Sequence, residues 1–188
     1  MTEIEFTILD GLQSIHNNVL DKIMTAFTFL GELGWFWILC GVALLFSEKY
    51  RKNGWIVLFT LLTGLLIANV LLKNLVARVR PYDINTAVNL IISKPTDWSF
   101  PSGHTTASFG AAAALMYANK KWGIAAYITA TILAFSRMYL YVHYPTDILG
   151  GILVGTLSFI IVITVYKHIN WEKAAEKLKG KDKSIHTL

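Results

Sequence analysis

Five long stretches of this chain contain no Asp, Glu, Lys or Arg, and they limit what it can fold into. They are Leu33–Ser47, Gly54–Leu72, Thr105–Asn119, Trp122–Ser136 and Ile148–Tyr166. A helix that crosses a bilayer needs about 20 apolar residues. The second and fifth stretches meet this requirement, and the other three depend on their flanking residues. A soluble helix normally keeps one polar face, so these stretches predict a membrane protein.

The number and placement of the charges support this prediction. Charged residues make up 15% of the chain, whereas roughly 25% is typical of soluble domains. The formal net charge is +5, but the basic residues lie between the apolar stretches and near the C-terminus. Such clusters set membrane topology, and they form no basic face for nucleic acid. We therefore expect no nucleic-acid partner.

The segment before the first stretch has a helical apolar pattern. Residues Ile4, Ile8, Leu12 and Ile15 recur at helical spacing, which predicts an amphipathic helix over Ile4–His16 at the interface or against the bundle. Val19–Leu30 continues it as a possible sixth membrane segment. The predicted fold is all-α: a polytopic bundle of five or six membrane segments in one domain, residues 1–170, followed by a polar basic tail, residues 171–188.

Basic residues also predict the orientation of the chain. They follow the first, third and fifth stretches, and with five spans these regions share one side, which the positive-inside rule assigns to the cytoplasm. The C-terminus is then cytoplasmic. The connections Lys73–His104 and Arg137–Asp147 lie on the outer side, where their basic residues are disfavoured and indicate a function. We expect a multi-pass protein of a bacterial cell membrane.

The second stretch ends in the motif Lys73-x6-Arg80-Pro81. Proline disfavours helical backbone in the residue before it, so we expect the helix to end at Arg80. Lys73, Ala77 and Arg80 are four and then three residues apart, which places both cations on one helical face, where they can grip an anion. Taken by itself, this cluster is also explained as the basic end of a membrane helix whose long side chains snorkel to the interface. Arg78 lies off the shared face and is expected at the membrane interface.

The sequence Pro101-Ser102-Gly103-His104 precedes the third stretch. Ser102 is a suitable helix cap, Gly103 lets backbone amides approach a ligand, and a helix N-terminus favours an anion. His104 can then donate a proton to a leaving oxygen. A capped helix start without a function fits this motif equally well by itself.

A third cluster, Ser136-Arg137-x5-His143-x3-Asp147, joins the fourth and fifth stretches. Arg137 supplies another cation. Pro145 suits a first helical turn, which places Asp147 near the helix start and close to His143. A carboxylate there can fix the tautomer of the imidazole and leave its other nitrogen free to attack. The simpler interpretation is that His143 lies at the membrane interface and that Asp147 interacts with the dipole at the start of its helix.

Together the clusters place three cations, two histidines, a carboxylate and a glycine turn on one membrane face. This set suits phosphoryl transfer without a metal. The cations neutralise the phosphoryl oxygens, one histidine attacks phosphorus, and the other protonates the leaving oxygen. No carboxylate cluster suited to magnesium accompanies them in the sequence. We therefore expect no cofactor.

The order of these motifs resembles the signature of the type 2 phosphatidic acid phosphatase family, whose active site is similar to that of vanadium-dependent haloperoxidases. The motif resemblance covers Lys73–Asp147, and every signature position is met. It implies that His143 is a nucleophile that forms a phosphohistidine, that Asp147 orients it, and that His104 is the general acid and later the base. It also implies that the phosphoryl group is held by Lys73, Arg80, Ser102, Gly103 and Arg137.

A site at the outer ends of membrane helices lies at the depth of lipid headgroups. The resemblance implies undecaprenyl diphosphate, phosphatidylglycerol phosphate or phosphatidic acid as substrate, and the compact chain looks most like undecaprenyl-diphosphate phosphatases. Lipid A phosphatases are similar in plan. A lipid-phosphate binding or transport protein without turnover is the alternative of another class, although it would not need two placed histidines. The apolar stretches disfavour a soluble haloperoxidase-like role.

Two smaller features bear on reactivity and on helix packing. Cys40 is the single cysteine and lies in an apolar stretch, which favours a small buried hydrophobe over a reactive thiol. Gly151 and Gly155 form a small-xxx-small pair, which predicts close packing within the bundle, with homodimerisation as the alternative. The sequence fits a monomer or a homodimer.

Overall fold

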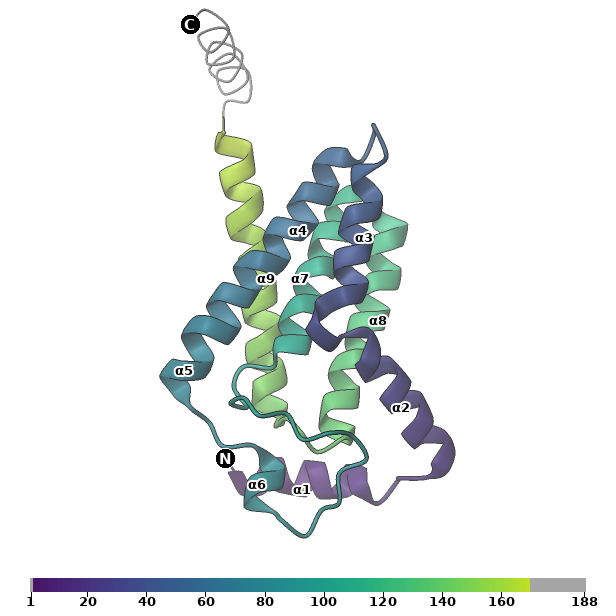
Figure 1. The fold of residues 1–188 in the computed structure, drawn as a ribbon, viewed down its shortest axis with the longest axis vertical. Helices are drawn as coiled ribbons and strands as arrows, with labels where there is room; N and C mark the ends of the chain where they lie inside the picture. Colours follow the sequence, from purple (N-terminus) through teal and green to yellow (C-terminus); the bar gives the residue numbers. More distant parts are fainter. Residues whose placement is uncertain (1, 170–188) are drawn as a thin grey trace, which may run out of the picture.

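The computed structural model describes residues 2–169, and every regular element among them is helical (Figure 1). This confirms the predicted all-α architecture. The basic tail predicted for residues 171–188 lies outside the described residues. The elements are α1 (Thr2–Gln13), α2 (Asn18–Leu30), the short 3-10 helix η1 (Glu32–Gly34), α3 (Trp35–Leu45), α4 (Arg51–Leu65), the π-helix η2 (Leu66–Leu72), α5 (Lys73–Val76), α6 (Pro81–Ile84), α7 (Gly103–Ala118), α8 (Lys120–Tyr139) and α9 (Pro145–His168).

Helices α3, α4, α7, α8 and α9 run side by side, and α1 crosses the lower end of this bundle in Figure 1. The central helix α7 packs against α4, α8 and α9. Two glycines of α9 permit close approach to α7: a Cβ added to Gly155 would lie 2.4 Å from the carbonyl oxygen of Thr106, and one added to Gly151 would lie 2.8 Å from that of Ser102. The predicted close packing of these two glycines within the bundle is therefore confirmed.

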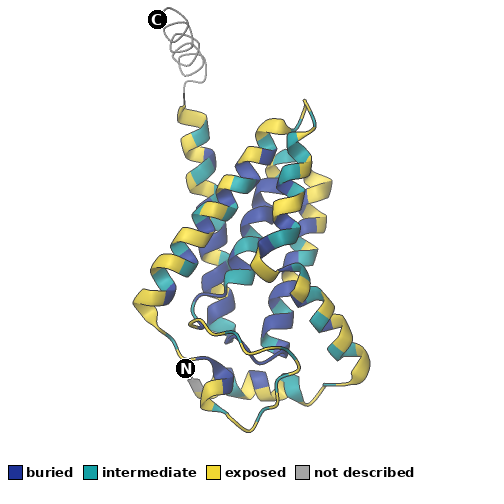
Figure 2. Ribbon diagram, viewed as in Figure 1, coloured by how far each residue is buried: buried dark blue, intermediate teal, exposed yellow. Residues whose placement is uncertain are grey.

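Many residues on the outer faces of the bundle are exposed (Figure 2), and they include many large apolar ones. Two helical stretches, Arg51–Ile84 and Pro145–His168, are long and apolar enough to cross a membrane. The pair Asn18–Leu30 and Glu32–Leu45, bent by 45°, is a third candidate if it forms one span. The structure thus supports two or three spans by length and composition, where the sequence predicted five or six.

Helix α1 turns its apolar stripe outward. Ile4 is 69% exposed and Ile8 is 44% exposed, whereas Glu5 and Leu9, on another face, are buried. The predicted amphipathic helix is confirmed, although it ends at Gln13. A stripe of this kind suits the membrane interface, while the opposite face places a carboxylate inside the protein.

The prediction that the second membrane helix runs to Arg80 is wrong. Helix α5 ends at Val76, because Ala77 adopts left-handed backbone with φ 46° and ψ 44°. Residues 77–80 are irregular, and α6 begins at Pro81. Lys73 and Arg80 therefore do not share a helical face, and their meeting in the site depends on a different part of the chain.

Candidate active site

Lys73 lies where the membrane helix changes its winding. Residues Leu66–Leu72 form the π-helix η2, a conformation that often marks functional sites. Lys73 follows directly, and its side chain is buried. Asn69 of η2 lines the same cavity as Lys73. The wider winding therefore turns two polar residues of an otherwise apolar segment toward the protein interior.

Arg80 meets Lys73 through the loop of residues 85–102. The buried guanidinium of Arg80 donates from Nε to the Asp97 carbonyl (2.7 Å), and its Nη2 lies 2.6 Å from Asp97 Oδ1. The carboxylate of Asp97 also pairs with the ammonium of Lys73. Arg80 Nη1 donates to the carbonyl of Val142, 2.7 Å away. One loop carboxylate thus joins the two cations that sequence reasoning had placed on one helix.

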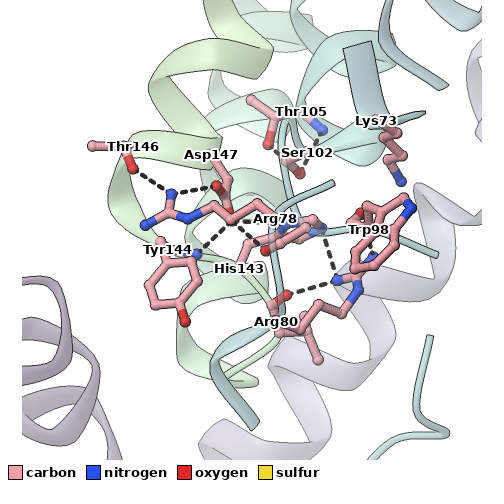
Figure 3. Close-up of polar contacts among 12 residues, drawn as sticks. Lys73, Arg78, Arg80, Trp98, Ser102, Thr105, His143, Tyr144, Thr146 and Asp147 are labelled. Atoms are coloured by element: carbon pink, nitrogen blue, oxygen red, sulfur yellow. Dashed lines mark hydrogen bonds and ion pairs between the residues drawn. The ribbon is translucent and has the colours of Figure 1, made fainter. Parts of the chain in front are cut away.

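His143 lies in the loop between α8 and α9 and contacts a buried carboxylate (Figure 3). Its Nδ1 is 3.4 Å from Asp147 Oδ2, and its Nε2 is 3.3 Å from Arg80 Nη1. Pro145 opens α9, and Asp147 near the start of that helix accepts from the backbone amide of Tyr144 at 2.9 Å. The hydroxyl of Ser99 donates to the same oxygen at 2.5 Å. The start of α9 therefore fixes Asp147, and Asp147 contacts His143.

The electrostatic surroundings keep His143 neutral. Burial lowers its pKa well below the usual value, and the positive charges of Arg80, Arg137 and Lys73 lower it further, against a smaller opposing effect of Asp97. The carboxylate of Asp147 favours a proton on Nδ1, so the lone pair of the imidazole resides on Nε2. This nitrogen lies beside the guanidinium of Arg80. A neutral imidazole in this tautomer can act as a nucleophile.

The start of α7 lies against the start of α9. Ser102 is the N-cap of α7, as predicted, and its hydroxyl accepts from the amide of Thr105 at 3.4 Å. Its own amide donates to the carbonyl of Asp147 at 3.1 Å. Gly103 and His104 follow in the first turn of α7, and both line the site cavity. Backbone contact between the two helix starts therefore holds His104 near His143.

Helix α2 closes the opposite side of the site. Arg137 of α8 is buried and donates from Nη1 to the hydroxyl of Thr28. Among the described residues, its Nε is buried and has no hydrogen-bond partner, so this guanidinium keeps a donor for a ligand. Next to it, a Cβ added to Gly31 would lie only 2.7 Å from His104 Cδ2. The end of α2 is thus packed directly on the imidazole of His104.

These groups surround one cavity of about 1120 Å³. Six of the predicted site residues line it: Lys73, Arg80, Gly103, His104, Arg137 and His143. Apolar side chains line it as well, among them Ile38 of α3 and Leu62 and Leu65 of α4, which are all partly exposed on the outside of the bundle. The cavity therefore connects a cationic pocket with the apolar surface of the membrane helices.

The structure brings all eight predicted site residues together in two layers. Six line the cavity, whereas Ser102 and Asp147 are fully buried behind it. Sequence reasoning missed Asp97, and it gave Arg78 only a place at the membrane interface, whereas the structure also pairs Arg78 with a site residue: its Nη1 lies 2.6 Å from Asp147 Oδ1. Neither residue belongs to a periodic pattern. Within residues 2–169, no three His, Cys, Asp or Glu side chains are grouped so that they could hold a metal ion.

Comparison with known proteins adds a family match. Residues 53–171 match the model of the PAP2 superfamily. An undecaprenyl-diphosphatase, BcrC of Bacillus subtilis, is 34% identical over 154 residues, which cover 81% of this chain and 77% of the relative. An undecaprenyl-diphosphatase of Sulfolobus acidocaldarius is also 34% identical, over 79% of this chain and 73% of the relative.

A solved structure has the same fold. The crystal structure of a transmembrane PAP2-type phosphatidylglycerolphosphate phosphatase from Bacillus subtilis superposes with a TM-score of 0.73 at 28% sequence identity. The superposition covers 90% of this chain and 87% of that one. The fold of this chain is therefore similar to that of a solved transmembrane phosphatase.

Proposed function

This chain belongs to the PAP2 superfamily, and on that premise we propose that it is a membrane phosphatase that removes the terminal phosphate of a polyprenyl diphosphate. Undecaprenyl diphosphate is the proposed substrate. The reaction proceeds through a phosphohistidine on His143. The products are the polyprenyl monophosphate and inorganic phosphate.

One observation supports this proposal above the others: three cations and two histidines line a cavity that is also lined by apolar side chains of the membrane helices α3 and α4. The cations match a phosphate, and the apolar side chains match the first part of a lipid tail. A protein that only binds or transports the lipid needs the cations but not two histidines. The pair His104 and His143 therefore favours turnover over the non-catalytic alternative.

In the first step, Nε2 of His143 attacks the terminal phosphorus. Its lone pair forms the nitrogen–phosphorus bond while the bond from phosphorus to the bridging oxygen breaks. His104 gives its proton to that departing oxygen. Asp147 holds the proton on Nδ1 and stabilises the positive charge that develops on the imidazole. The phosphoryl oxygens are held by Lys73, Arg80, Arg137 and the Gly103 amide. Ser102, buried behind the cavity, acts as the cap that fixes the start of α7.

In the second step, His104 takes a proton from water, and the resulting hydroxide attacks phosphorus. The nitrogen–phosphorus bond breaks, its electron pair returns to His143, and phosphate is released. Every proton and electron pair is thereby accounted for within the two histidines, water and substrate. Because guanidinium and ammonium groups carry the charge compensation, the mechanism assigns no step to a metal ion.

The choice of a diphosphate rests on the relatives. Two of them are named undecaprenyl-diphosphatases, each 34% identical to this chain. The similar solved structure is a phosphatidylglycerolphosphate phosphatase, so that phospholipid is the second candidate, followed by phosphatidic acid. All three present a terminal phosphate on an apolar anchor, and they differ in the group next to it.

We place the site on the outer face of a bacterial cell membrane, in a single domain of five or six membrane segments. The α3–α4 connection, which carries Lys49, and the start of α8, which carries Lys120 and Lys121, lie at the end of the bundle opposite loop 85–102 (Figure 1). The positive-inside rule assigns that basic end, where α9 also ends, to the cytoplasm, and we propose the same side for the C-terminus. The glycines of α9 face α7, which supports a monomer over a dimer built through them.

The proposal is tested with purified protein in detergent and a chelator. Phosphate release is measured from undecaprenyl diphosphate, phosphatidylglycerol phosphate and phosphatidic acid, with soluble organic phosphates as controls. We expect turnover to be fastest with the diphosphate, to be lost in His143→Ala, and to persist in His168→Ala, a matched change at an exposed position of α9. Activity that survives in His143→Ala would refute the mechanism.

A further inference from the structure

Arg78 lies behind the candidate nucleophile, on the side of Asp147 that faces away from His143. It belongs to the irregular segment after α5, and its carbonyl accepts from the amide of Ser99 at 2.9 Å. Its Nη1 lies 2.6 Å from Asp147 Oδ1, whereas the other oxygen, Oδ2, faces His143 (Figure 3). The two oxygens of one buried carboxylate are thus divided between Arg78 and the imidazole.

A second carboxylate holds Arg78 from α1. Glu5 Oε2 lies 2.6 Å from Arg78 Nη2, and the guanidinium also stacks 3.8 Å from the ring of Tyr144. Glu5 Oε1 accepts from the hydroxyl of Thr146 at 2.5 Å, near the start of α9. The first helix of the chain is therefore linked to the candidate nucleophile through Arg78 and Asp147.

The burial of Glu5 requires an explanation. It is 5% exposed on a helix whose apolar stripe faces outward, and a buried carboxylate costs several kcal/mol unless it is paired and hydrogen-bonded. The ion pair with Arg78 and the two contacts with Thr146 supply this compensation. A hydrophobic residue would anchor α1 without that requirement, so the chemistry of this contact points to Arg78 and not to packing.

We infer that Glu5 and Arg78 are positioning residues for the reaction, in which Arg78 holds Asp147 against His143 and Glu5 holds Arg78. This inference rests on the proposed function. Arg78 also draws negative charge away from the Asp147 oxygen that faces the imidazole. Glu5 acts in the opposite sense, because it shares the positive charge of Arg78.

The two residues therefore have opposite effects on the basicity of His143. In Arg78→Gln, Asp147 is no longer neutralised by a cation and stabilises the protonated imidazole more strongly, so the pKa of His143 rises. In Glu5→Gln, the charge of Arg78 acts on Asp147 alone, so the pKa of His143 falls. A purely structural role would not predict shifts of opposite sign.

Other charged groups also face His143, and they are unchanged in both variants. They are Lys73 of α5, Arg80 before α6, Asp97 of loop 85–102, His104 of α7, Arg137 of α8 and Asp147 of α9. The titration of the substrate phosphate is also common to all variants. A difference in the His143 titration between the variants therefore arises from the contacts of Arg78.

The test combines two measurements on the full chain in detergent. The titration of His143 is followed by NMR of 15N-histidine-labelled protein, with His143→Ala to assign its signals, and kcat/KM is measured against pH. We expect the His143 titration and the acid limb of the profile to move to higher pH in Arg78→Gln and to lower pH in Glu5→Gln. Glu3→Gln, an exposed change on the same helix, should match the wild type.

The rate adds a separate readout. We expect kcat in Arg78→Gln to fall about tenfold or more, as is typical when a partner that orients a reacting group is lost, while KM changes little. Arg78→Lys should keep the wild-type acid limb because it keeps the charge. Identical His143 titrations in wild type, Arg78→Gln and Glu5→Gln would overturn this inference even in an active enzyme. Absence of phosphate release from the wild type would instead overturn the proposed function.

Discussion

The carboxylate of Asp97 lies against the guanidinium of Arg80, with Oδ1 2.6 Å from Nη2, and it pairs with Lys73 as well. Burial raises the pKa of Asp97, but its hydrogen bonds and ion pairs with these two cations outweigh burial and lower the pKa to about 2. The carboxylate is thus ionised throughout the working pH range. It occupies the place between two cations that the proposed mechanism gives to a phosphoryl group.

Asp97→Asn should strengthen the binding of anions. Without the carboxylate, phosphate no longer displaces a charged competitor from Lys73 and Arg80, so we expect the inhibition constant of inorganic phosphate to fall about tenfold, the equivalent of about one charge-assisted hydrogen bond. The measurement is inhibition of lipid turnover by phosphate at constant pH. Asp83→Asn, an exposed change on α6, is the control. Unchanged or weaker inhibition would show that Asp97 does not compete with phosphate.

Protonation of Asp97 should strengthen phosphate binding by the wild type in the same way, but only at very low pH. The depressed pKa means that the ion pairs of Asp97 contribute stability above the unfolded-state pKa of about 4, and that this contribution is lost as the pH falls toward about 2. Phosphate inhibition should therefore differ between wild type and Asp97→Asn by the same ratio at every pH from 5 to 8. A ratio that varies within this range would contradict the low pKa.

Arg137→Lys should cost most of the activity although it keeps the charge. The guanidinium is held by Thr28 through Nη1 and has a free buried Nε, and a lysine offers no second donor in a fixed geometry. We expect kcat/KM to fall about 100-fold, as when a donor to the transition state is removed. Arg51→Lys, at the other end of the bundle, is the control. Turnover near that of the wild type would rule out a two-donor contact by Arg137.

Gly31→Ala should disturb His104 selectively. The added methyl group would lie 2.7 Å from both His104 Cδ2 and a methyl group of Leu133, so the imidazole must move. We expect a large loss with lipid substrates, which need a proton on the leaving oxygen, and a smaller loss with p-nitrophenyl phosphate, whose leaving group needs none. Gly11→Ala, where the methyl group meets nothing within 4 Å, is the control. Equal losses in the rate of phosphohistidine formation from both substrates would show that His104 does not protonate the leaving oxygen.

Gly155→Ala should lower stability without changing the oligomeric state. Its methyl group would lie 2.4 Å from the Thr106 carbonyl and 2.9 Å from the Gly110 amide, so α7 and α9 must separate, at a cost of about 1–3 kcal/mol. Thermal unfolding in detergent and light scattering measure the two quantities. A change from dimer to monomer with unaltered thermal stability would instead place this glycine at a contact between copies.

Local signals in the sequence predicted much of the site. Ser102 caps α7 and Pro145 opens α9 because caps and first-turn prolines depend only on adjacent backbone. The spacing of His143 and Asp147 across that helix start likewise predicted their contact, in which Nδ1 and Oδ2 lie 3.4 Å apart. These features need no knowledge of the rest of the chain.

The parts that sequence reasoning missed depend on long-range or atypical geometry. Alanine rarely adopts left-handed backbone, so nothing local indicated that Ala77 ends the helix before Arg80. Asp97 lies in an irregular loop, where no period assigns a direction to a side chain. Glu5 and Arg78 are separated by 73 positions, and only the folded chain brings them together.

The central claim is that His143 carries the phosphoryl group during turnover. The most direct measurement is rapid acid-free quenching of the enzyme with undecaprenyl diphosphate labelled with 32P at the terminal phosphorus. We predict a protein-bound label that is stable in alkali and labile in acid, present in wild type and Asp97→Asn and absent from His143→Ala. Label on another residue, or full turnover with no bound label at any time, would contradict the account.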